Sequence, residues 1–347
     1  MKALVENLLA IVLYYSGLIK ILRQIGRKYA KILIYHSISD EESCFIKSPT
    51  NIWVYHRLFI DHMEYIKKYY NVVSLQQLIE SIKKGQLTPG SLVITFDDGF
   101  ADNYRFAYPV LKKFRLPATI FIATEPIDEK KPLWLQQLNY LINKYSIDRI
   151  TELIDGNGNL CNPKLKNLIK QAACKEEKSK KLEQFMTYEL SKSQRAHIIS
   201  YMYQQLNISS ESIFSKNKIY LDWEEIKEMH RYGIAFGNHG QSHSVFVTMS
   251  LKEQGYEIEN SMKLIRKNLN SNFMPFAYPF GQKRCFNDQT IKIVEQAGHD
   301  CILTAIPTLT HAKSNINELG RIPVGNVPAY RLAYELERSV LKNMLKI

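Results

Sequence analysis

Two adjacent carboxylates, Asp97 and Asp98, follow a run of apolar or β-branched residues at positions 92–96 and precede Gly99. Successive side chains of a strand point to opposite faces, so the two acids do not serve one structural purpose. An Asp-Gly turn explains one of them but not both. Because α/β enzymes place their chemistry at the carboxyl ends of parallel strands, the pair could divide two tasks. One acid would bind a cation and the other would move a proton.

Two histidines could supply further ligands for such a cation. His239 and His243 are four residues apart in the stretch FGNHGQSH, which places them on one side of a helical turn. Two imidazoles and a distant carboxylate make a three-ligand set that leaves open positions for water, as catalytic zinc requires. Surface histidines in a polar loop are the alternative for a bare H-x-x-x-H. The Asp-Asp-Gly at the end of a strand favours the metal site.

The elements that must position these residues alternate along the chain. Short β-like runs are separated by amphipathic helices, which favours a parallel sheet, either open or closed into a barrel. The candidate strands are 31–36, 71–74, 92–96, 117–124, 234–238, 275–281, 301–305 and 320–324. Residues 125–219 carry no β-like run of comparable strength, so we predict a mostly helical insertion there. Its expected anchor onto the barrel consists of Leu133, Trp134, Leu138 and Leu141.

Three segments together carry a family resemblance: TFDDG at 95–99, GNHGQSH at 237–243 and AYPFG at 277–281. In order and spacing they resemble the motifs of the polysaccharide deacetylase family, carbohydrate esterase family four, which carries the NodB homology domain. The similarity covers residues 31–124 and 220–325. The resemblance implies an α/β fold, namely a distorted (β/α) barrel. It also implies a hydrolase that removes N-acetyl groups from amino sugars with a divalent metal, usually Zn²⁺.

Carried over residue by residue, the resemblance also implies roles for the acids and histidines. Asp98, His239 and His243 would bind the metal. Asp97 would be the general base that takes a proton from the metal-bound water, which then attacks the acetamide carbonyl. The division is physically reasonable, since a metal lowers the pKa of its water toward neutrality and a modest carboxylate base then suffices.

The same resemblance places an oxyanion site and a general acid elsewhere in the chain. A backbone N–H near Tyr278, Pro279 and Phe280 would stabilise the oxyanion. Independently of the resemblance, Tyr278 and Trp134 could stack on a sugar ring, and packing in the core is the alternative for both. The late histidine motif that supplies the acid in many family members is not visible. His36, in I-Y-H-S, resembles the Y-H motif of circularly permuted members, in which an N-terminal histidine supplies the acid. A histidine that caps the strand end through hydrogen bonds is the alternative.

The chain departs from the family pattern at the residue that orients the base. Ala277 stands where the third motif often begins with an arginine. Arg321, in G-R-I-P-V, resembles a late arginine of members with the A-Y-P-F-G form, and it could pair with Asp97 instead. An ordinary surface arginine is the alternative. Ala235 and Gly240 replace residues that are frequent in the second motif, and neither replacement removes a metal ligand.

Composition sets the expected surroundings of the protein. The 347 residues carry a net charge of +12, which would suit a phosphate-bearing or membrane-bound substrate, although Lys-rich compositional drift explains it as well. No nucleic-acid-binding module is recognisable. The cysteines form no C-x-x-C pair, which argues against a disulfide framework and for a reducing compartment. They are Cys44, Cys161, Cys174, Cys285 and Cys301.

Residues 1–30 are predicted to form one amphipathic helix. Spacings of three and four residues line one face of it with Leu4, Leu8, Ile11, Tyr15, Leu18, Leu22 and Ile25. The uncharged stretch 7–19 is short for a bilayer span, and the N-terminus lacks the features of a cleavable signal peptide. We therefore expect a cytoplasmic protein. The helix either contacts the anionic inner face of the membrane peripherally or docks on the domain.

The sequence thus predicts four parts of the chain. They are the N-terminal helix in 1–30, a deacetylase barrel in 31–124 and 220–328, the insertion in 125–219 and a terminal helix in 329–347. The expected substrate is an N-acetylated glycan or a lipid-linked or nucleotide-linked sugar, as in the biosynthesis of cell-envelope polysaccharides. A catalytically degenerate barrel that binds carbohydrate and an amidase on a non-sugar amide are the alternatives.

Overall fold

A computed structural model describes residues 2–40, 45, 52–157 and 162–345. Eight strands form one parallel sheet in the order β10-β1-β5-β6-β7-β8-β9, with β4 paired to β5. Two further strands, β2 and β3, form a separate parallel pair. The strands are β1 Lys31–Tyr35, β2 Ser37–Ser39, β3 Trp53–Tyr55, β4 Asn71–Val72, β5 Ser91–Phe96, β6 Thr119–Ile122, β7 Ala235–Asn238, β8 Phe276–Ala277, β9 Ile302–Leu303 and β10 Ile322–Pro323.

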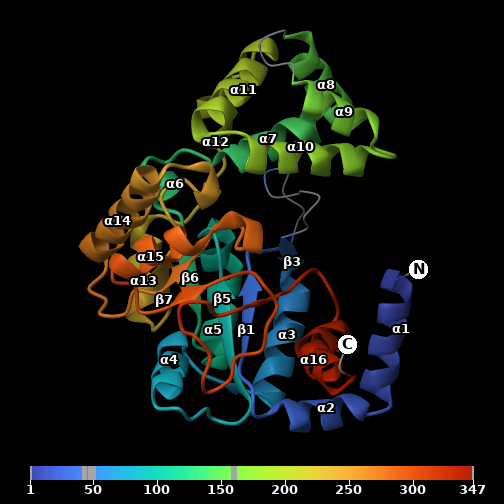
Figure 1. The fold of residues 1–347 in the computed structure, drawn as a ribbon, viewed down its shortest axis with the longest axis vertical. Coiled ribbons are helices and arrows are strands. Elements are labelled where there is room, and N and C mark those ends of the chain that lie inside the picture. Colours follow the sequence, from blue (N-terminus) through green and yellow to red (C-terminus); the bar gives the residue numbers. More distant parts are fainter. Residues whose placement is uncertain (1, 41–44, 46–51, 158–161, 346–347) are drawn as a thin grey trace.

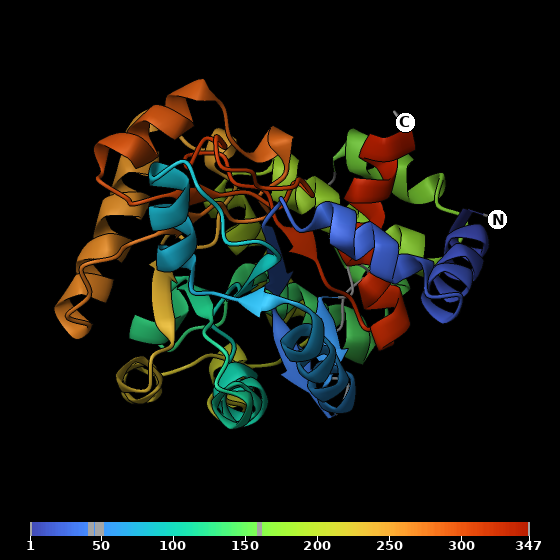
Figure 2. The ribbon, with the colours of Figure 1, turned by 90° about the horizontal axis from the view of Figure 1, so that it is seen from below.

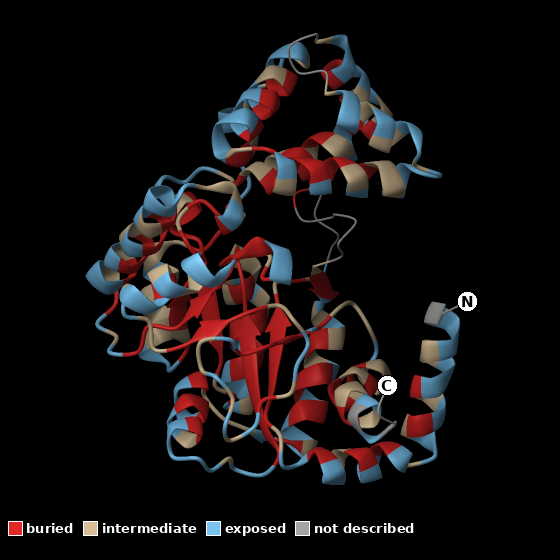
Figure 3. Cartoon of the chain, in the orientation of Figure 1, coloured by how far each residue is buried: buried red, intermediate tan, exposed pale blue. Residues whose placement is uncertain are grey.

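The sheet is curled and its two ends are joined by one segment. Ile322 of β10 pairs with Leu33 of β1, and Leu319, three residues earlier, forms a bridge with Leu303 of β9. Every residue of β1 and β5 is buried, as expected for parallel strands whose two faces are both covered (Figure 3). The predicted distorted (β/α) barrel is therefore confirmed.

Helices surround the curled sheet (Figures 1 and 2). They are α3 His56–Tyr69, α4 Leu75–Lys83, α5 Tyr108–Phe114, α13 Trp223–Arg231, α14 Leu251–Asn268 and α15 Asp288–Gln296. Ser74, Asp222 and Ser250 begin α4, α13 and α14 with capping boxes, in which the cap side chain and the third helical side chain exchange hydrogen bonds with the backbone. The first turns of these helices are thus specified locally by the sequence.

The insertion between β6 and β7 is helical, as predicted. The part of 125–219 that the structure describes contains no strand. Its helices are α6 Thr124–Asp128, α7 Trp134–Tyr145, α8 Ile147–Gly156, α9 Pro163–Lys170, α10 Lys175–Glu189, α11 Lys192–Gln205 and α12 Ser210–Phe214. Figure 1 shows α7–α12 as a separate layer beyond the carboxyl ends of β1 and β5. Leu138 and Leu141 of α7 are fully buried in a hydrophobic cluster that continues into the barrel, as expected of an anchor.

The prediction of one N-terminal helix is wrong. Residues 2–26 form two helices, α1 Lys2–Tyr15 and α2 Leu18–Gly26, which are bent by 90° relative to one another. Gly17 lies between them with φ 81°, a left-handed conformation that ends a helix and that glycine adopts without a steric penalty. Within the described chain, no single helix has the length and apolar composition of a membrane span. The part of α1 from Leu4 onward meets the criteria of length and apolar composition only when it is taken together with α2, and the two helices are separated by the bend.

The C-terminal helix α16, Ala329–Leu345, begins at the predicted residue and packs against α1 and α2 (Figure 1). Its Glu337 forms a buried ion pair with Lys31 of β1, with 3.3 Å between Nζ and Oε2. Glu337 also accepts a hydrogen bond of 2.6 Å from the hydroxyl of Tyr70. Removing one partner of a buried ion pair leaves an uncompensated charge, so this contact holds α16 in one position on the barrel.

Three of the cysteines lie in the part of the chain that the structure describes, and all three are free thiols. Cys174 is exposed, whereas Cys285 and Cys301 are buried. Burial raises the pKa of the Cys301 thiol and of the Cys285 thiol, so both are packing residues rather than reactive ones. Cys44 and Cys161 lie outside the described residues.

Candidate metal centre and active site

The two carboxylates after β5 lie at the carboxyl edge of the sheet, where the sequence predicts chemistry. The chain leaves the strand through two left-handed residues, Asp98 with φ 72° and Gly99 with φ 74°. Asp adopts this conformation more readily than most side chains do, and glycine has no Cβ to clash. Asp97 and Asp98 are 3% and 4% exposed. The turn therefore buries two adjacent acids, which requires positive partners.

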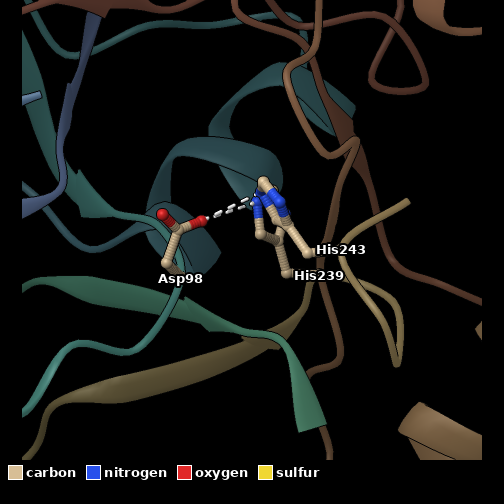
Figure 4. A group of neighbouring side chains, drawn as sticks. All are labelled: Asp98, His239 and His243. Carbon is tan, nitrogen blue, oxygen red and sulfur yellow. Dashed lines mark ion pairs between the residues drawn. The ribbon is translucent and has the colours of Figure 1, made fainter. Parts of the chain in front are cut away.

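Asp98, His239 and His243 converge on one point, as predicted (Figure 4). Asp98 Oδ1 lies 3.5 Å from His239 Nε2 and 3.1 Å from His243 Nε2. One ligand atom of each residue lies within 4.8 Å of the other two. Two ligands of a tetrahedral ion with bonds of about 2.1 Å are about 3.4 Å apart, so the spacing fits zinc.

Two further features of this cluster fit a cation. His239 Nδ1 donates a hydrogen bond of 2.7 Å to the carbonyl oxygen of Ala277, which leaves the lone pair of Nε2 facing Asp98. The buried Asp98 Oδ1 accepts no hydrogen bond from any residue that the structure describes. Burial would raise the pKa of Asp98, but His243 and His239 outweigh it and hold the pKa well below its ordinary value. Asp98 is thus anionic, and its Oδ1 is available to coordinate a divalent cation.

Arg321 forms a bidentate ion pair with Asp97. Its two terminal nitrogens lie 2.6 and 2.8 Å from the two carboxylate oxygens, and its side chain is fully buried, which excludes the surface alternative. Arg321 also donates to the Thr304 carbonyl at 3.0 Å and to the Thr95 hydroxyl at 3.2 Å. Burial would raise the pKa of Asp97, but the charges of Arg321 and His239 hold it below its ordinary value. Asp97 is therefore an oriented, anionic carboxylate next to the candidate metal ligands.

His36 lies beside Asp97 at the same edge. Tyr35 and Phe96 are partners in the parallel register of β1 and β5, so the residues that follow them leave the two strands side by side. Burial lowers the pKa of the His36 imidazole, whereas the charges of Asp98 and Asp97 act in the opposite direction. A histidine that interacts electrostatically with both acids is in a position to act on the same substrate.

Two polar side chains, the half-buried Asp102 and the buried Asn103, hold the segment that carries His36. The Asn103 side chain donates a hydrogen bond of 2.7 Å to the His36 carbonyl. Asp102 accepts hydrogen bonds from the Ser37 hydroxyl and from the Ile38 N–H. Burial raises the pKa of Asp102 to about 7, although these hydrogen bonds lower it. Asp102 and Asn103 therefore position the His36 segment, a role that the sequence alone did not indicate.

The segment from Tyr278 to Phe280 contains one backbone donor that fits the predicted oxyanion site. The Tyr278 N–H donates to the Leu303 carbonyl at 3.2 Å, and Pro279 has no N–H, so neither can serve. The prediction is corrected for these two residues. The N–H of Phe280 has no partner among the described residues. The centroid of the Phe280 ring lies 4.8 Å from that of the His243 ring, which places Phe280 against the candidate metal ligands.

The two predicted sugar-stacking residues lie in different surroundings. Tyr278 is 1% exposed and stacks on Phe286 with 4.4 Å between ring centroids, so of the two alternatives its ring packs in the core. Trp134 is half-buried and, with Arg195, lines a cavity of about 430 Å³ between the insertion and Ser244. Stacking on a sugar ring stays a prediction for Trp134.

The loop that carries both imidazoles is held by two buried side chains that sequence reasoning missed. Glu257 of α14 accepts hydrogen bonds from the N–H groups of Gln241 and Ser242, at 2.9 and 2.7 Å. Arg195 of α11 donates to the hydroxyl of Ser244 at 3.0 Å and is 1% exposed. The insertion thus contacts the loop directly. No motif marks Glu257 or Arg195, because each contact joins elements that are far apart in the sequence.

Backbone strain also gathers at this site. Asp98, His243 and Phe280 have φ values of 72°, 52° and 61°. A residue other than glycine in the left-handed region costs about 1–3 kcal/mol and persists only where the surrounding structure imposes it. The three residues belong to three separate segments that meet at the cluster, so this part of the fold is pre-organised for a common task.

Comparison with known proteins agrees with these observations. A family model described as polysaccharide deacetylase matches residues 84–152 and 185–302, more than half of the chain. The Bacillus subtilis protein YxkH, provisionally assigned as a polysaccharide deacetylase, is 32% identical over 127 residues, which are 34% of this chain and 43% of that protein. A poly-beta-1,6-N-acetyl-D-glucosamine N-deacetylase of Staphylococcus aureus is 40% identical over 58 residues, 17% of this chain and 20% of the relative. The chain therefore matches less than half the length of these curated relatives.

Solved structures share the fold. The Streptococcus pyogenes deacetylase PplD, in complex with acetate, has a TM-score of 0.57 and 20% identity over 89% of this chain and 98% of its own. IcaB from Ammonifex degensii has a TM-score of 0.56 and 15% identity over 90% of this chain and 97% of its own. At such identities the likeness concerns the fold alone. With the family model covering more than half of its length, the chain belongs to the polysaccharide deacetylase family.

Proposed function

We propose that this protein is a metal-dependent hydrolase that removes N-acetyl groups from an amino sugar of a glycan. The observation that carries the proposal is the meeting of Asp98, His239 and His243 beside the buried Asp97–Arg321 pair. Carboxylates held anionic in a buried site, next to metal-ligating groups, are typical of catalytic sites. A degenerate barrel that only binds carbohydrate would have no use for the paired base.

Asp98, His239 and His243 would hold the divalent cation, for which we propose Zn²⁺, and its charge would lower the pKa of water and polarise the acetamide carbonyl. Asp97 accepts the proton of the attacking water. It is suited to this task because Arg321 keeps it ionised and fixes the orientation of both oxygens. Since the pKa of Asp97 is lowered, the base stays available well into the acidic range.

Two other groups complete the proposed reaction. The free N–H of Phe280 would donate to the carbonyl oxygen as that oxygen gains negative charge. His36 would protonate the leaving amine, since it lies beside Asp97 at the end of the neighbouring strand. Asp97 would take up a proton and the adjacent His36 would deliver one. The C–N bond could then break with a neutral amine as the leaving group, in place of a charged amide anion.

The proposed substrate is a glycan that contains N-acetylated amino sugars, in polymeric, lipid-linked or nucleotide-linked form. The name of the Staphylococcus aureus relative specifies poly-beta-1,6-N-acetyl-D-glucosamine, which supports an N-acetylglucosamine polymer as the first candidate. The net charge of +12 supports a substrate or carrier that bears phosphate.

Acetate release tests the function directly. The purified chain is incubated with an N-acetylglucosamine oligosaccharide, a nucleotide-linked N-acetyl sugar, a lipid-linked N-acetyl sugar and a non-sugar acetamide, each with and without chelator. We expect acetate from at least one sugar and its loss on chelation. Sugar binding without turnover would identify a binding barrel, and release from the non-sugar acetamide alone would identify an amidase.

Arg321→Met is expected to move the acidic limb of the pH–rate profile to higher pH. The guanidinium is the largest of the charges that oppose the effect of burial, so without it the pKa of Asp97 rises and the base is protonated at pH values where the native enzyme is active. The measurement is kcat/KM from acidic to neutral pH. Arg321→Lys keeps the positive charge but loses the bidentate geometry, so its pH–rate profile should lie between those of the native enzyme and of Arg321→Met.

The same substitution affects stability in a defined direction. A carboxyl group with a depressed pKa in the folded state stabilises the fold above its unfolded pKa, and this contribution is lost as pH falls through the folded pKa. In Arg321→Met the contribution of Asp97 should be absent at neutral pH, and the unpaired buried carboxylate costs about 3–5 kcal/mol in unfolding free energy. An unchanged acidic limb together with unchanged stability would contradict the pairing.

His36→Gln is expected to lower kcat by about 100-fold and to abolish the alkaline limb of the pH–rate profile. The acid must be protonated to act, so in the native enzyme activity falls as pH rises through the pKa of His36. The matched control is His311→Gln, which changes an exposed histidine in the loop after β9. If the alkaline limb of His36→Gln equals that of the native enzyme, another group is the acid.

A further inference from the structure

Large apolar side chains are exposed on one side of the N-terminal helices, over a region that we call the N-terminal apolar surface. Among the residues that the structure describes, most exposed large apolar side chains lie on α1 and α2. The most informative are Leu4, Leu8 and Val12 on α1, exposed by 74%, 62% and 51%, and Leu18, Ile21 and Ile25 on α2, exposed by 46%, 57% and 37%. Apolar patches of this kind mark a binding surface rather than ordinary exposure.

The helical spacing separates this surface from the side that packs on the protein. Ala10 and Leu13 of α1 and Ile19 and Leu22 of α2 are buried, and both helices contact α16. Figure 3 shows buried positions on the inner sides of the two helices and exposed ones along their outer sides. The most exposed side chains thus face away from the side on which the two helices pack.

The charges around the surface have one sign. Among the side chains described between Leu4 and Tyr29, the exposed charged ones are Lys20, Arg27 and Lys28. The acid of α1, Glu6, turns toward α16, where it pairs with Arg331 at 3.1 Å and Arg338 at 2.8 Å. The surface therefore combines apolar side chains with basic ones and exposes no acid.

We propose that the N-terminal apolar surface binds the interface of an anionic lipid bilayer. Apolar side chains of a peripheral helix insert at the boundary between head groups and acyl chains, while Lys and Arg contact the lipid phosphates. α1 has 14 residues and α2 has 9. At 1.5 Å per residue these are about 21 and 14 Å long, short of the ~30 Å hydrocarbon core, so neither helix spans the core by itself.

A second copy of the chain is the competing occupant, and charge disfavours it. A symmetric pair of surfaces would bring Lys20, Arg27 and Lys28 of one copy close to those of the other, and each chain carries a net charge of +12. A lipid surface with negative phosphates removes this repulsion. The inference concerns binding alone, so it stands or falls independently of the deacetylase activity.

The test is co-sedimentation of the full chain with vesicles of phosphatidylcholine alone or mixed with phosphatidylglycerol. We expect binding to the anionic vesicles that weakens as salt is added. The Leu8→Glu/Val12→Glu double variant should bind at least about 100-fold more weakly, since each withdrawn apolar side chain is worth roughly a factor of ten. Tyr256→Glu, at a 62% exposed position on α14, is the matched control and should bind as the native chain does.

Replacing Lys20, Arg27 and Lys28 with glutamine should lower the affinity for anionic vesicles by about fivefold per residue and leave binding to neutral vesicles unchanged. Circular dichroism and the melting temperature of every variant show that the fold is retained. Absence of vesicle binding by the native chain would overturn the proposal. So would a lipid-free dimer that the double variant dissociates, or a vesicle-bound chain that alkaline carbonate does not extract.

Discussion

Asp97→Asn is expected to lower kcat by about 1,000-fold while the protein keeps its metal. The amide cannot accept a proton, so the contribution of a general base, typically 10²–10⁴-fold, is lost. Asp97 is not one of the three residues whose ligand atoms converge, so metal affinity should change little. The measurement is acetate release under saturating substrate, together with the zinc content of the dialysed protein.

The stability of this variant must be followed in parallel. Arg321 is fully buried, and Asp97 is its carboxylate partner, so the asparagine leaves an unpaired guanidinium. Loss of one partner of a buried pair costs about 3–5 kcal/mol, and the melting temperature should fall accordingly. Activity is therefore compared at a temperature where both proteins are folded. A folded variant with native kcat would show that Asp97 is not the base.

Asp98→Asn is expected to weaken zinc binding by more than about 100-fold and to abolish turnover with it. A single oxygen of Asp98 faces both imidazoles, and the amide has neither its charge nor its two equivalent oxygens. The expected loss exceeds the 10–100-fold effect that is typical of removing an outer hydrogen-bond partner of a ligand. Competition with a fluorescent chelator measures the affinity without any need for substrate.

Asp97→Asn serves as the control for this measurement, because it makes the same chemical change at the neighbouring position. If both variants bind zinc as the native protein does, the cluster is not the metal site. If both lose zinc equally, the division of labour between the two acids is wrong. Only a loss confined to Asp98→Asn agrees with the assignment.

The strands were predictable where a local run of apolar residues ends at a turn. β5 and β6 lie within or next to the predicted runs, because β-branched and aromatic residues fill both faces of a covered parallel strand. Of the predicted strand 275–281, only two residues form a strand, which is β8. Pro279 has no N–H for the ladder, and Phe280 adopts a left-handed conformation, so the strand cannot continue. The short β2–β3 pair was missed because its register depends on tertiary contacts.

The N-terminal helices show where periodicity misleads. The apolar spacing runs through Gly17 without interruption, and it predicted one continuous face. A glycine after an apolar helix is also a common helix end, and in the structure this local preference prevails. The spacing is right within each helix and wrong across the bend.

The candidate site was predictable as far as it follows strands and short motifs. Asp97 and Asp98 follow β5 directly and His239 follows β7 directly, so the parallel topology alone brings them to one edge. Arg321 stands just before β10, and the family resemblance, not the topology, predicted its contact with Asp97. The roles of Glu257 and Arg195 were not predictable, because the sequence of a helix does not show which distant segments its side chains contact. The choice of Phe280 over Tyr278 as the backbone donor likewise required knowing which N–H the neighbouring strand uses.

The location of α2 bears on which sugars of a tethered chain the enzyme can process. The carbonyl of Arg27, just after α2, accepts a hydrogen bond of 2.7 Å from Gly90, immediately before β5 begins, whereas Asp98 follows the end of β5. Six residues of strand separate the two by about 20 Å. α2 therefore lies at the opposite end of β5 from Asp98. If α2 rests on a bilayer, a sugar joined directly to a lipid in that bilayer would lie far from the proposed active site, and sugars toward the free end of the chain would be the ones deacetylated.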